Sequence, residues 1–251
     1  MQYVAKKKDI EQRLLEEPEM ELLERFVNAE SNVIDIGANF AYYTHRLAKL
    51  APRGHVYAFE PIPFTHDVAK KIIGHYRFRN VTLYPWGAGD ENAEKVFEVP
   101  LQSFGAYSAG QAHLSGRNNE LSGKEQHYAF ASHEKVNCRI VRIDDLGEIK
   151  HPIDFVKIDI EGAELFALRG MKQLLLKDQP VVLLEINPFF LEGFGIAPVE
   201  LTGLFASLNS KIFKYDPAAK KLVHWTGAFV ESNYILIPEA KLGNFSDLIS
   251  T

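Results

Sequence analysis

The chain has 251 residues, of which 46% are hydrophobic and 24% are charged, and its formal net charge is -5 at pH 7. This length suits one large α/β domain or two smaller ones, and the composition is typical of a globular protein with a full core. The small negative charge argues against a nucleic-acid surface, which normally needs a basic patch.

The N-terminal part of the chain predicts helices. Apolar residues recur at helical spacing over residues 9–29. Pro18 interrupts this pattern and predicts two helices, because an interior proline removes a hydrogen bond and clashes with the preceding turn. We therefore expect an N-terminal helical extension over residues 1–30.

Short apolar runs separated by helical patterns follow the extension. The runs are residues 32–36, 55–60, 81–86, 154–160 and 181–186. Strands that alternate with helices of this length predict βαβ units, and hence a parallel sheet with helices on both faces. Two further runs, 211–216 and 233–239, predict an antiparallel hairpin that closes the sheet.

One segment, residues 91–137, interrupts the alternation. It begins with a predicted strand in "EKVFEVP", continues through a stretch rich in Gly, Ser and Asn, and returns in a predicted strand within "KVNCRIVRIDDL". A connection of this length in a compact domain is usually a functional lid, a binding loop or disordered. We expect a lid-like insertion whose residues 100–135 gate a substrate site.

Polar residues and a glycine follow the first two predicted strands. Asp35 ends the first strand and Gly37 starts the turn into the next helix, an arrangement that lets a ligand approach the backbone. Glu60 ends the second strand, where a carboxylate can accept hydrogen bonds from ribose hydroxyls. A plain βα turn and a solvated carboxylate are the structural alternatives. The dinucleotide pattern G-x-G-x-x-G is absent, since positions 37, 39 and 42 are Gly, Asn and Tyr.

Six segments together resemble the FkbM-type methyltransferases, a branch of the class I S-adenosylmethionine-dependent enzymes. They are "VIDIGANFAYYT", "VYAFEP", "VTLYPWGAGD", "VRIDDL", "VKIDIEGAELFALRGM" and "VVLLEIN", of which "KIDIEGAE" is the most specific. The resemblance covers about residues 30–190. It implies an α/β, Rossmann-like domain over residues 31–251, with a seven-stranded, mostly parallel sheet whose sixth and seventh strands are antiparallel.

The resemblance also implies S-adenosylmethionine as the cofactor. It places Asp35, Gly37 and Asn39 at the methionine end, Glu60 at the ribose, and Trp86 and Gly87 near the adenine, with Ala38, Thr44 and Asp159 completing the cofactor set. The chain departs from the family at Ala41, where glycine is usual. If that position is helical, alanine fits. If it needs positive φ or free space, alanine weakens binding.

Two carboxylates, Asp159 and Glu161, follow the fourth strand. Carboxylates favour the start of a helix, which accounts for one of them but less well for an acid inside the sheet beside Lys157. We predict that Asp159 accepts the proton of a hydroxyl acceptor, with Glu161 as the second catalytic residue. Glu185 is a third acid at the same edge. Such a cluster can bind a divalent cation or pair with Lys157 or Arg169, and because its spacing does not require a metal, none is predicted.

The leading hypothesis for function is therefore O-methylation of a hydroxyl on a small metabolite or a sugar-containing molecule. A nicotinamide-dependent oxidoreductase is an alternative, disfavoured by the missing glycines and by "KIDIEGAE". A non-catalytic, methyltransferase-like binding protein is a second alternative, for which Ala41 is the only indication.

The cellular setting is also an expectation from the sequence. Cys138 is the single cysteine, so no internal disulfide can form and a reducing compartment is favoured. The N-terminus lacks the apolar stretch of a secretory signal, and no run approaches the roughly 18 apolar residues of a membrane span. We expect a soluble cytoplasmic protein without a nucleic-acid or membrane partner. The sequence predicts neither the acceptor nor the oligomeric state.

Overall fold

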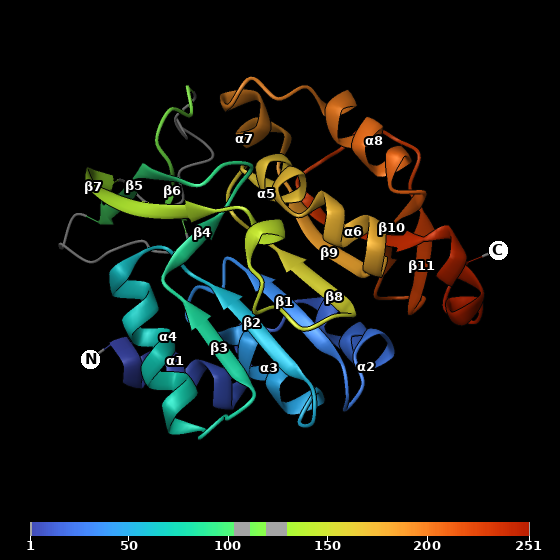
Figure 1. Ribbon diagram of the computed structural model, residues 1–251, viewed down its shortest axis with the longest axis horizontal. Helices are drawn as coiled ribbons and strands as arrows, with labels where there is room; N and C mark the ends of the chain where they lie inside the picture. The colour runs from blue at the N-terminus through green and yellow to red at the C-terminus, as the bar shows by residue number, and fades with distance from the viewer. Residues whose placement is uncertain (1, 103–110, 119–129, 251) are drawn as a thin grey trace.

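A computed structural model describes residues 2–102, 111–118 and 130–250 of the chain. Its main feature is one sheet with the strand order β11-β10-β12-β9-β8-β1-β2-β3 (Figure 1). The strands are β1 (Asn32–Ile36), β2 (His55–Phe59), β3 (Val81–Tyr84), β8 (Ile153–Ile158), β9 (Val181–Ile186), β10 (Ser210–Asp216), β11 (Lys221–His224) and β12 (Ser232–Pro238). From β3 to β9 neighbouring strands are parallel, whereas β12, β10 and β11 pair antiparallel.

This topology confirms the predicted α/β sheet and its closing hairpin, with two corrections. The sheet has eight strands rather than seven, because β11 pairs with the outer side of β10. Strands β2 and β8 also end one and two residues before the predicted ends. Glu60 and Asp159 therefore lie just beyond these strands. The expectation that Asp159 lies inside the sheet was wrong.

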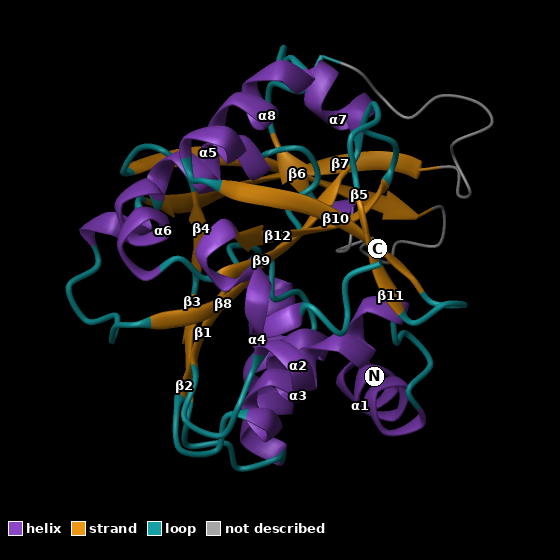
Figure 2. Cartoon of the chain, turned by 90° about the vertical axis from the view of Figure 1, so that its right-hand side faces the viewer, coloured by secondary structure: helices purple, strands orange, loops and turns teal. Residues whose placement is uncertain are grey.

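Helices cover both faces of the sheet (Figure 2). One face packs against α5 (Glu164–Gly170), α6 (Lys172–Asp178), α7 (Pro188–Gly193) and α8 (Pro198–Ser207). The opposite face packs against α2 (Leu23–Phe26) and α3 (Tyr42–Leu50), with α4 (Pro63–His75) beside them. Successive strand residues point to opposite faces of the sheet. Ile34 packs in the hydrophobic cluster of the face covered by α5 to α8, and Val33 in the cluster of the face covered by α2 and α3.

The N-terminal region consists of α1 (Gln2–Gln12) and, after a break, the 3-10 turn η1 (Pro18–Leu22) and α2. The predicted division at Pro18 is confirmed, although the first helix begins earlier than residue 9. Leu23 and Phe26 are buried in the same cluster as the sheet residue Phe155, and the Phe26 and Phe155 rings stack with centroids 6.1 Å apart. Helix α2 is therefore packed into the core, whereas α1 contains no buried residue.

The predicted strands of the 91–137 segment are present and belong to a second sheet. Its strands are β4 (Trp86–Ala88), β5 (Ala93–Gln102), β6 (His113–Leu114) and β7 (Phe130–Val141), in the order β4-β7-β5-β6. Residues 103–110 and 119–129, which form most of the expected lid, lie outside the described residues. The remaining short helices are η4 (Ile143–Asp145) and η5 (Glu239–Phe245). In the described ranges, no helix is both long enough and apolar enough to cross a membrane.

The second sheet packs closely against helix α5 of the first sheet at a glycine. Gly170 ends α5, and a Cβ atom at this position would lie 1.8 Å from the carbonyl oxygen of Gly89, which follows β4. No side chain fits there without moving the backbone. Gly203 in α8 offers a contrast, because no atom lies within 4 Å of its Cβ position.

We predict that Gly170→Ala destabilises the protein by about 1–3 kcal/mol, the usual cost of overpacking. The matched control Gly203→Ala should instead stabilise it by about 0.5–1 kcal/mol, because alanine loses less backbone entropy in a helix. Urea denaturation measures both free energies of unfolding. Equal effects of the two substitutions would contradict the proposed close contact.

Candidate active site

The carboxyl ends of β2, β1 and β8 are joined by backbone contacts. The Gly37 N–H donates to the Phe59 carbonyl at 3.0 Å, and the Asp159 N–H donates to the Ile36 carbonyl at 3.1 Å. Gly37 has φ +79°, and a Cβ atom there would lie 1.9 Å from the Asp159 carbonyl oxygen. Only glycine satisfies both conditions. The predicted glycine turn therefore holds two strand ends together.

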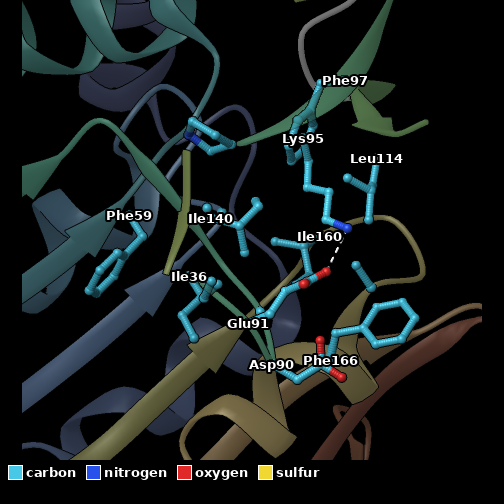
Figure 3. Close-up of a pocket in the computed structure, with 16 residues that line it drawn as sticks. Ile36, Phe59, Asp90, Glu91, Lys95, Phe97, Leu114, Ile140, Ile160 and Phe166 are labelled. Atoms are coloured by element: carbon cyan, nitrogen blue, oxygen red, sulfur yellow. Dashed lines mark ion pairs between the residues drawn. The ribbon is translucent and has the colours of Figure 1, made fainter. Parts of the chain in front are cut away.

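A cleft opens on both sides of Gly37. On one side lies an apolar slot between the two sheets, lined by Phe59, Ile140 and Ile160 among others (Figure 3). Gly87 and Gly89 also line this slot, and a Glu91–Lys95 ion pair lies among its lining residues. Such an apolar slot suits a planar, weakly polar ring.

On the other side lies a cavity of about 450 Å³, a volume within the usual range of small-molecule sites. Ala38, Asn39 and Asp159 line one wall. Residues 15–18 and Met20 of the N-terminal region line the other. The N-terminal region therefore forms part of the candidate site.

Glu60 lines a third, smaller hollow beside Gly37, together with Asn39, Asp159 and Glu161. Its carboxylate is buried, with Oε2 accepting from the Asn39 N–H and Oε1 from the Ile62 N–H, each at 2.9 Å. Burial raises the pKa of Glu60 to about 7, although the two backbone hydrogen bonds favour the ionised form. The carboxylate has a structural role, and its remaining lone pairs can still accept a ligand hydroxyl.

Ala41 is not helical. It has φ +64° and ψ +33° immediately before α3, so it occupies the left-handed region that glycine adopts without cost. Its methyl group is buried with Val68 and Ile72 of α4, and it is not among the residues that line the hollows beside Gly37. Alanine therefore strains the turn, but its side chain packs away from the cleft.

Lys157 is the central charge of the site. It lies in β8, directly beside Asp35 of β1 in the sheet register, and only 4% of its side chain is exposed. Its ammonium donates to Asp159 Oδ2 at 2.8 Å and lies 4.8 Å from the centre of the Tyr43 ring. Burial by itself would lower the pKa of Lys157, but Asp159 and Asp35 raise it above its ordinary value. Lys157 is therefore charged.

Asp35 is completely buried beside this ammonium. Thr44 donates its hydroxyl to Oδ2 at 2.6 Å, whereas Oδ1 has no hydrogen-bond partner in the part of the chain that the structure describes. Burial raises the pKa of Asp35, and Lys157 and Thr44 offset part of that rise. Asp35, which was predicted at the methionine end of the cofactor, is not among the residues that line the hollows beside Gly37, and its observed contact is with Thr44.

Asp159 shares its charge with two neighbours. Burial would raise its pKa, but the Lys157 ammonium and a hydrogen bond with Glu185 lower it below its ordinary value. Burial and the Asp159 charge raise the pKa of Glu185 to about 8, so Glu185 holds a proton near neutral pH. The pair therefore consists of an ionised Asp159 and a protonated Glu185 that donates to it.

Glu161 and Glu164 join Asp159 and Glu185 in a group of acids at the carboxyl ends of β8 and β9, called the acidic edge below. Glu161 has φ +57°, and its burial and the acids around it raise its pKa well above the ordinary value. Glu164 accepts from the Ile160 and Gly162 N–H groups at 3.2 and 3.1 Å, and burial raises its pKa to about 7. Glu164 was not predicted as a site residue, although it lies in the "KIDIEGAEL" segment.

Glu17 was also missed, because it lies 140 residues before Lys157 in the chain. It accepts from the Tyr43 hydroxyl at 2.7 Å and from Asn233 Nδ2 at 3.0 Å. Asn233 pairs with Glu185 across β12 and β9. The network around Lys157 thus extends to the N-terminal region, which no local pattern predicts.

Two predicted cofactor residues have other contacts. Thr44 is buried against Asp35, and Trp86 stacks on Tyr84 with ring centroids 4.9 Å apart. Neither is among the residues that line the hollows described above. Arg169 pairs with Glu200 at 2.9 Å rather than with the acidic edge. Within the described residues, no three Asp, Glu, His or Cys side chains are arranged as a metal-ligand set.

Comparison with known proteins gives consistent matches. The methyltransferase FkbM domain family matches residues 35–216 of the chain. Methyltransferase 1 of Beauveria bassiana (strain ARSEF 2860) is 26% identical over 150 residues, covering 57% of this chain and 59% of that protein. Methyltransferase sdnD of Sordaria araneosa is 26% identical over 171 residues, covering 58% of this chain and 63% of that protein. The chain thus spans less than two thirds of these curated relatives.

Among solved structures, the methyltransferase FkbM from Methylobacillus flagellatus KT superposes with a TM-score of 0.52. The match covers 94% of this chain and 59% of that chain, at 14% sequence identity. It supports a shared Rossmann-like α/β fold.

We predict that Glu185→Gln flattens the dependence of stability on pH. In the unfolded chain Glu185 loses its proton near its ordinary pKa of about 4.3, whereas the folded protein holds it up to about pH 8. Between these values only the folded state keeps the proton, so wild-type stability falls as pH rises. Glutamine keeps a donor to Asp159 without titrating.

The two proteins should have similar free energies of unfolding near pH 5, and the variant should be the more stable at about pH 9. Urea denaturation across this range measures the difference. Glu192→Gln, which changes an exposed carboxylate in α7, is the control and should leave the slope unchanged. Parallel pH profiles for wild type and Glu185→Gln would contradict the raised pKa.

Proposed function

Because the chain belongs to the FkbM methyltransferase family, we propose that it transfers the methyl group of S-adenosylmethionine to a hydroxyl oxygen of a small metabolite or sugar-containing molecule. The position of Asp159 carries this proposal. Its carboxylate is ionised beside Lys157, and the residue lines both the 450 Å³ cavity and the hollow that contains Glu60. A hydroxyl in that cavity can reach the carboxylate.

The residues present fit the proposed cofactor. Asn39 lines the cavity beside Gly37, and its buried, unpartnered Oδ1 suits the ammonium of a methionine group. Glu60 would hold the ribose, and the apolar slot beside Gly87 would accept the adenine. When bound, S-adenosylmethionine supplies an electrophilic methyl group on a sulfonium centre. The ionised Asp159 carboxylate favours this positive charge.

The chain's own residues would orient the acceptor and take its proton. An ionised carboxylate paired with Lys157 is a weak base, so Asp159 accepts the hydroxyl proton only late, when the new C–O bond has largely formed. Alignment therefore contributes most of the acceleration, since well-oriented partners can save about 7–11 kcal/mol of a barrier. Protonated Glu185 holds the Asp159 carboxylate in place by hydrogen bonding.

We predict that Glu60→Ala weakens S-adenosylhomocysteine binding by about 1–3 kcal/mol, because the Asn39 and Ile62 N–H groups lose their acceptor and the ribose loses its own. Isothermal titration calorimetry measures the affinity. Glu94→Ala, which removes an exposed carboxylate from β5, controls for the change in charge. Unchanged affinity in Glu60→Ala would remove the ribose assignment, and binding of NAD in place of S-adenosylhomocysteine would contradict the proposed function.

We predict that Asp159→Asn lowers methyl transfer by about 10²–10⁴-fold, the usual contribution of a positioned proton acceptor. The structure adds a stability cost, because the substitution leaves the buried Lys157 ammonium without its hydrogen-bonded counterion. Lys157→Met/Asp159→Asn removes both charges of the pair. Because Asp35 must then take up a proton, the double variant should recover only part of the lost stability, while transfer remains slow.

Melting temperature and single-turnover transfer, measured with an acceptor found by screening hydroxyl compounds, separate the two effects. A folded double variant with near-normal transfer would show that Asp159 has only a structural role. Binding of S-adenosylhomocysteine without transfer to any acceptor would instead favour a non-catalytic binding protein.

A further inference from the structure

Arg117 lies near Glu161, one of the acids of the candidate site, in a turn that is anchored on two sides. The turn follows β6 and contains Gly116 with φ +101°. The Ser115 N–H donates to the Val96 carbonyl of β5 at 2.8 Å, and the Asn118 N–H donates to the Gly193 carbonyl of α7 at 2.7 Å. These backbone contacts fix the position from which the Arg117 side chain extends.

The guanidinium of Arg117 is oriented by an aromatic ring but has free donors. It lies 4.3 Å from the centre of the Phe190 ring of α7, a cation–π contact. Its Nε and Nη1 atoms are buried and have no hydrogen-bond partner among the residues that the structure describes. Buried N–H donors on a charged group are costly to leave unpaired, so this arrangement is typical of a site that receives an acceptor group.

The nearby carboxylates do not use these donors. Glu98 accepts from Ser115 Oγ at 2.8 Å and lies 3.8 Å from Lys135 Nζ. Glu161 attracts Arg117 electrostatically, but the two form no ion pair in the described part of the chain. Burial and the neighbouring acids raise the pKa of Glu161 well above its ordinary value, which weakens its attraction for the guanidinium.

Arg117 is also close to the catalytic edge. Gly162 has φ +104°, and a Cβ atom there would lie 2.8 Å from Phe190 Cβ, so the turn after β8 packs directly against α7. Glu161, the residue before this glycine, lines a hollow together with Asp159. The guanidinium above Phe190 therefore lies on the side of the site that neighbours Asp159.

We propose that Arg117 binds an oxyanion carried by the methyl acceptor, a carboxylate or a phosphate, and so directs the acceptor hydroxyl toward Asp159. The planar fork of an arginine matches both groups through paired hydrogen bonds. That the ligand is the methyl acceptor rests on the proposed function, whereas the oxyanion site itself rests on the unpaired donors alone.

Arg139 provides a matched control. Its guanidinium also lies over an aromatic ring, 4.8 Å from the centre of Trp86. Arg139 is exposed on β7, however, and its nitrogens are not among the buried, unpartnered ones. It therefore has the same cation–π chemistry without the free buried donors.

The first experiment titrates the S-adenosylhomocysteine-loaded protein with inorganic phosphate and, separately, with acetate. The arginine Nε–H resonances are followed by NMR and assigned with Arg117→Lys and Arg139→Lys. We expect a saturable shift of the Arg117 resonance at ligand concentrations that leave Arg139 unmoved, and the stronger response identifies phosphate or carboxylate. Equal, non-saturating shifts of both resonances would overturn the oxyanion site.

The second experiment measures transfer from methyl-labelled S-adenosylmethionine to paired acceptors: hydroxy acids against their amides, and phosphorylated against unphosphorylated alcohols. Arg117→Gln should lower kcat/KM for the anionic member by about 10–100-fold, the worth of a hydrogen bond between charged groups, and leave the neutral member unchanged. Arg139→Gln should change neither.

The outcomes separate the two proposals. A saturable Arg117 shift without transfer to any acceptor supports the oxyanion site and contradicts the proposed function. Transfer that prefers neutral acceptors equally in wild type and Arg117→Gln overturns the role of Arg117 while leaving the methyltransferase activity intact.

Discussion

A buried ammonium, that of Lys157, sets the conditions for the rest of the site. A cation inside a parallel sheet must have counterions, because removing one partner of such a pair costs about 3–5 kcal/mol. Asp159 supplies a hydrogen-bonded carboxylate at 2.8 Å, and Asp35 lies beside Lys157 in the register of β1 and β8. The Lys157 ammonium thus requires the carboxylates of Asp159 and Asp35. The same requirement holds Asp159 ionised at the place where an acceptor hydroxyl would lie.

The backbone at this edge is arranged around close contacts and positive φ angles. Gly37 permits the strand ends of β1 and β8 to meet, while Asn39, Ala41 and Glu161 all adopt left-handed conformations near it. Each such non-glycine residue costs on the order of 1 kcal/mol or more and persists only where its surroundings enforce it. Strained residues beside Gly37 are compatible with a binding site there, and the packing of α4 around Ala41 shows how one of them is held.

Segments from outside the central sheet complete the site. The N-terminal region contributes a wall of the 450 Å³ cavity and, through Glu17, hydrogen bonds to Tyr43 and Asn233. The second sheet contributes one side of the apolar slot and carries Arg117 to Phe190. In the proposed function, the sheet edge would hold the cofactor and the acceptor hydroxyl, whereas these added segments would distinguish one acceptor from another.

The sequence by itself determined the α/β alternation, the strands β1 and β9 residue for residue, the C-terminal hairpin and the family. Hydrophobic periodicity and glycine turns are local signals, so they can be recognised from the sequence alone. Strand β11 was not predicted, because only Leu222 of its four residues is buried and the sequence shows no alternation of apolar and polar residues there. Tertiary structure alone decided the conformation of Ala41, the protonation of Glu185, and the meeting of Arg117 and Glu17 with the site. These depend on burial and on distances between residues far apart in the chain, which no local pattern encodes.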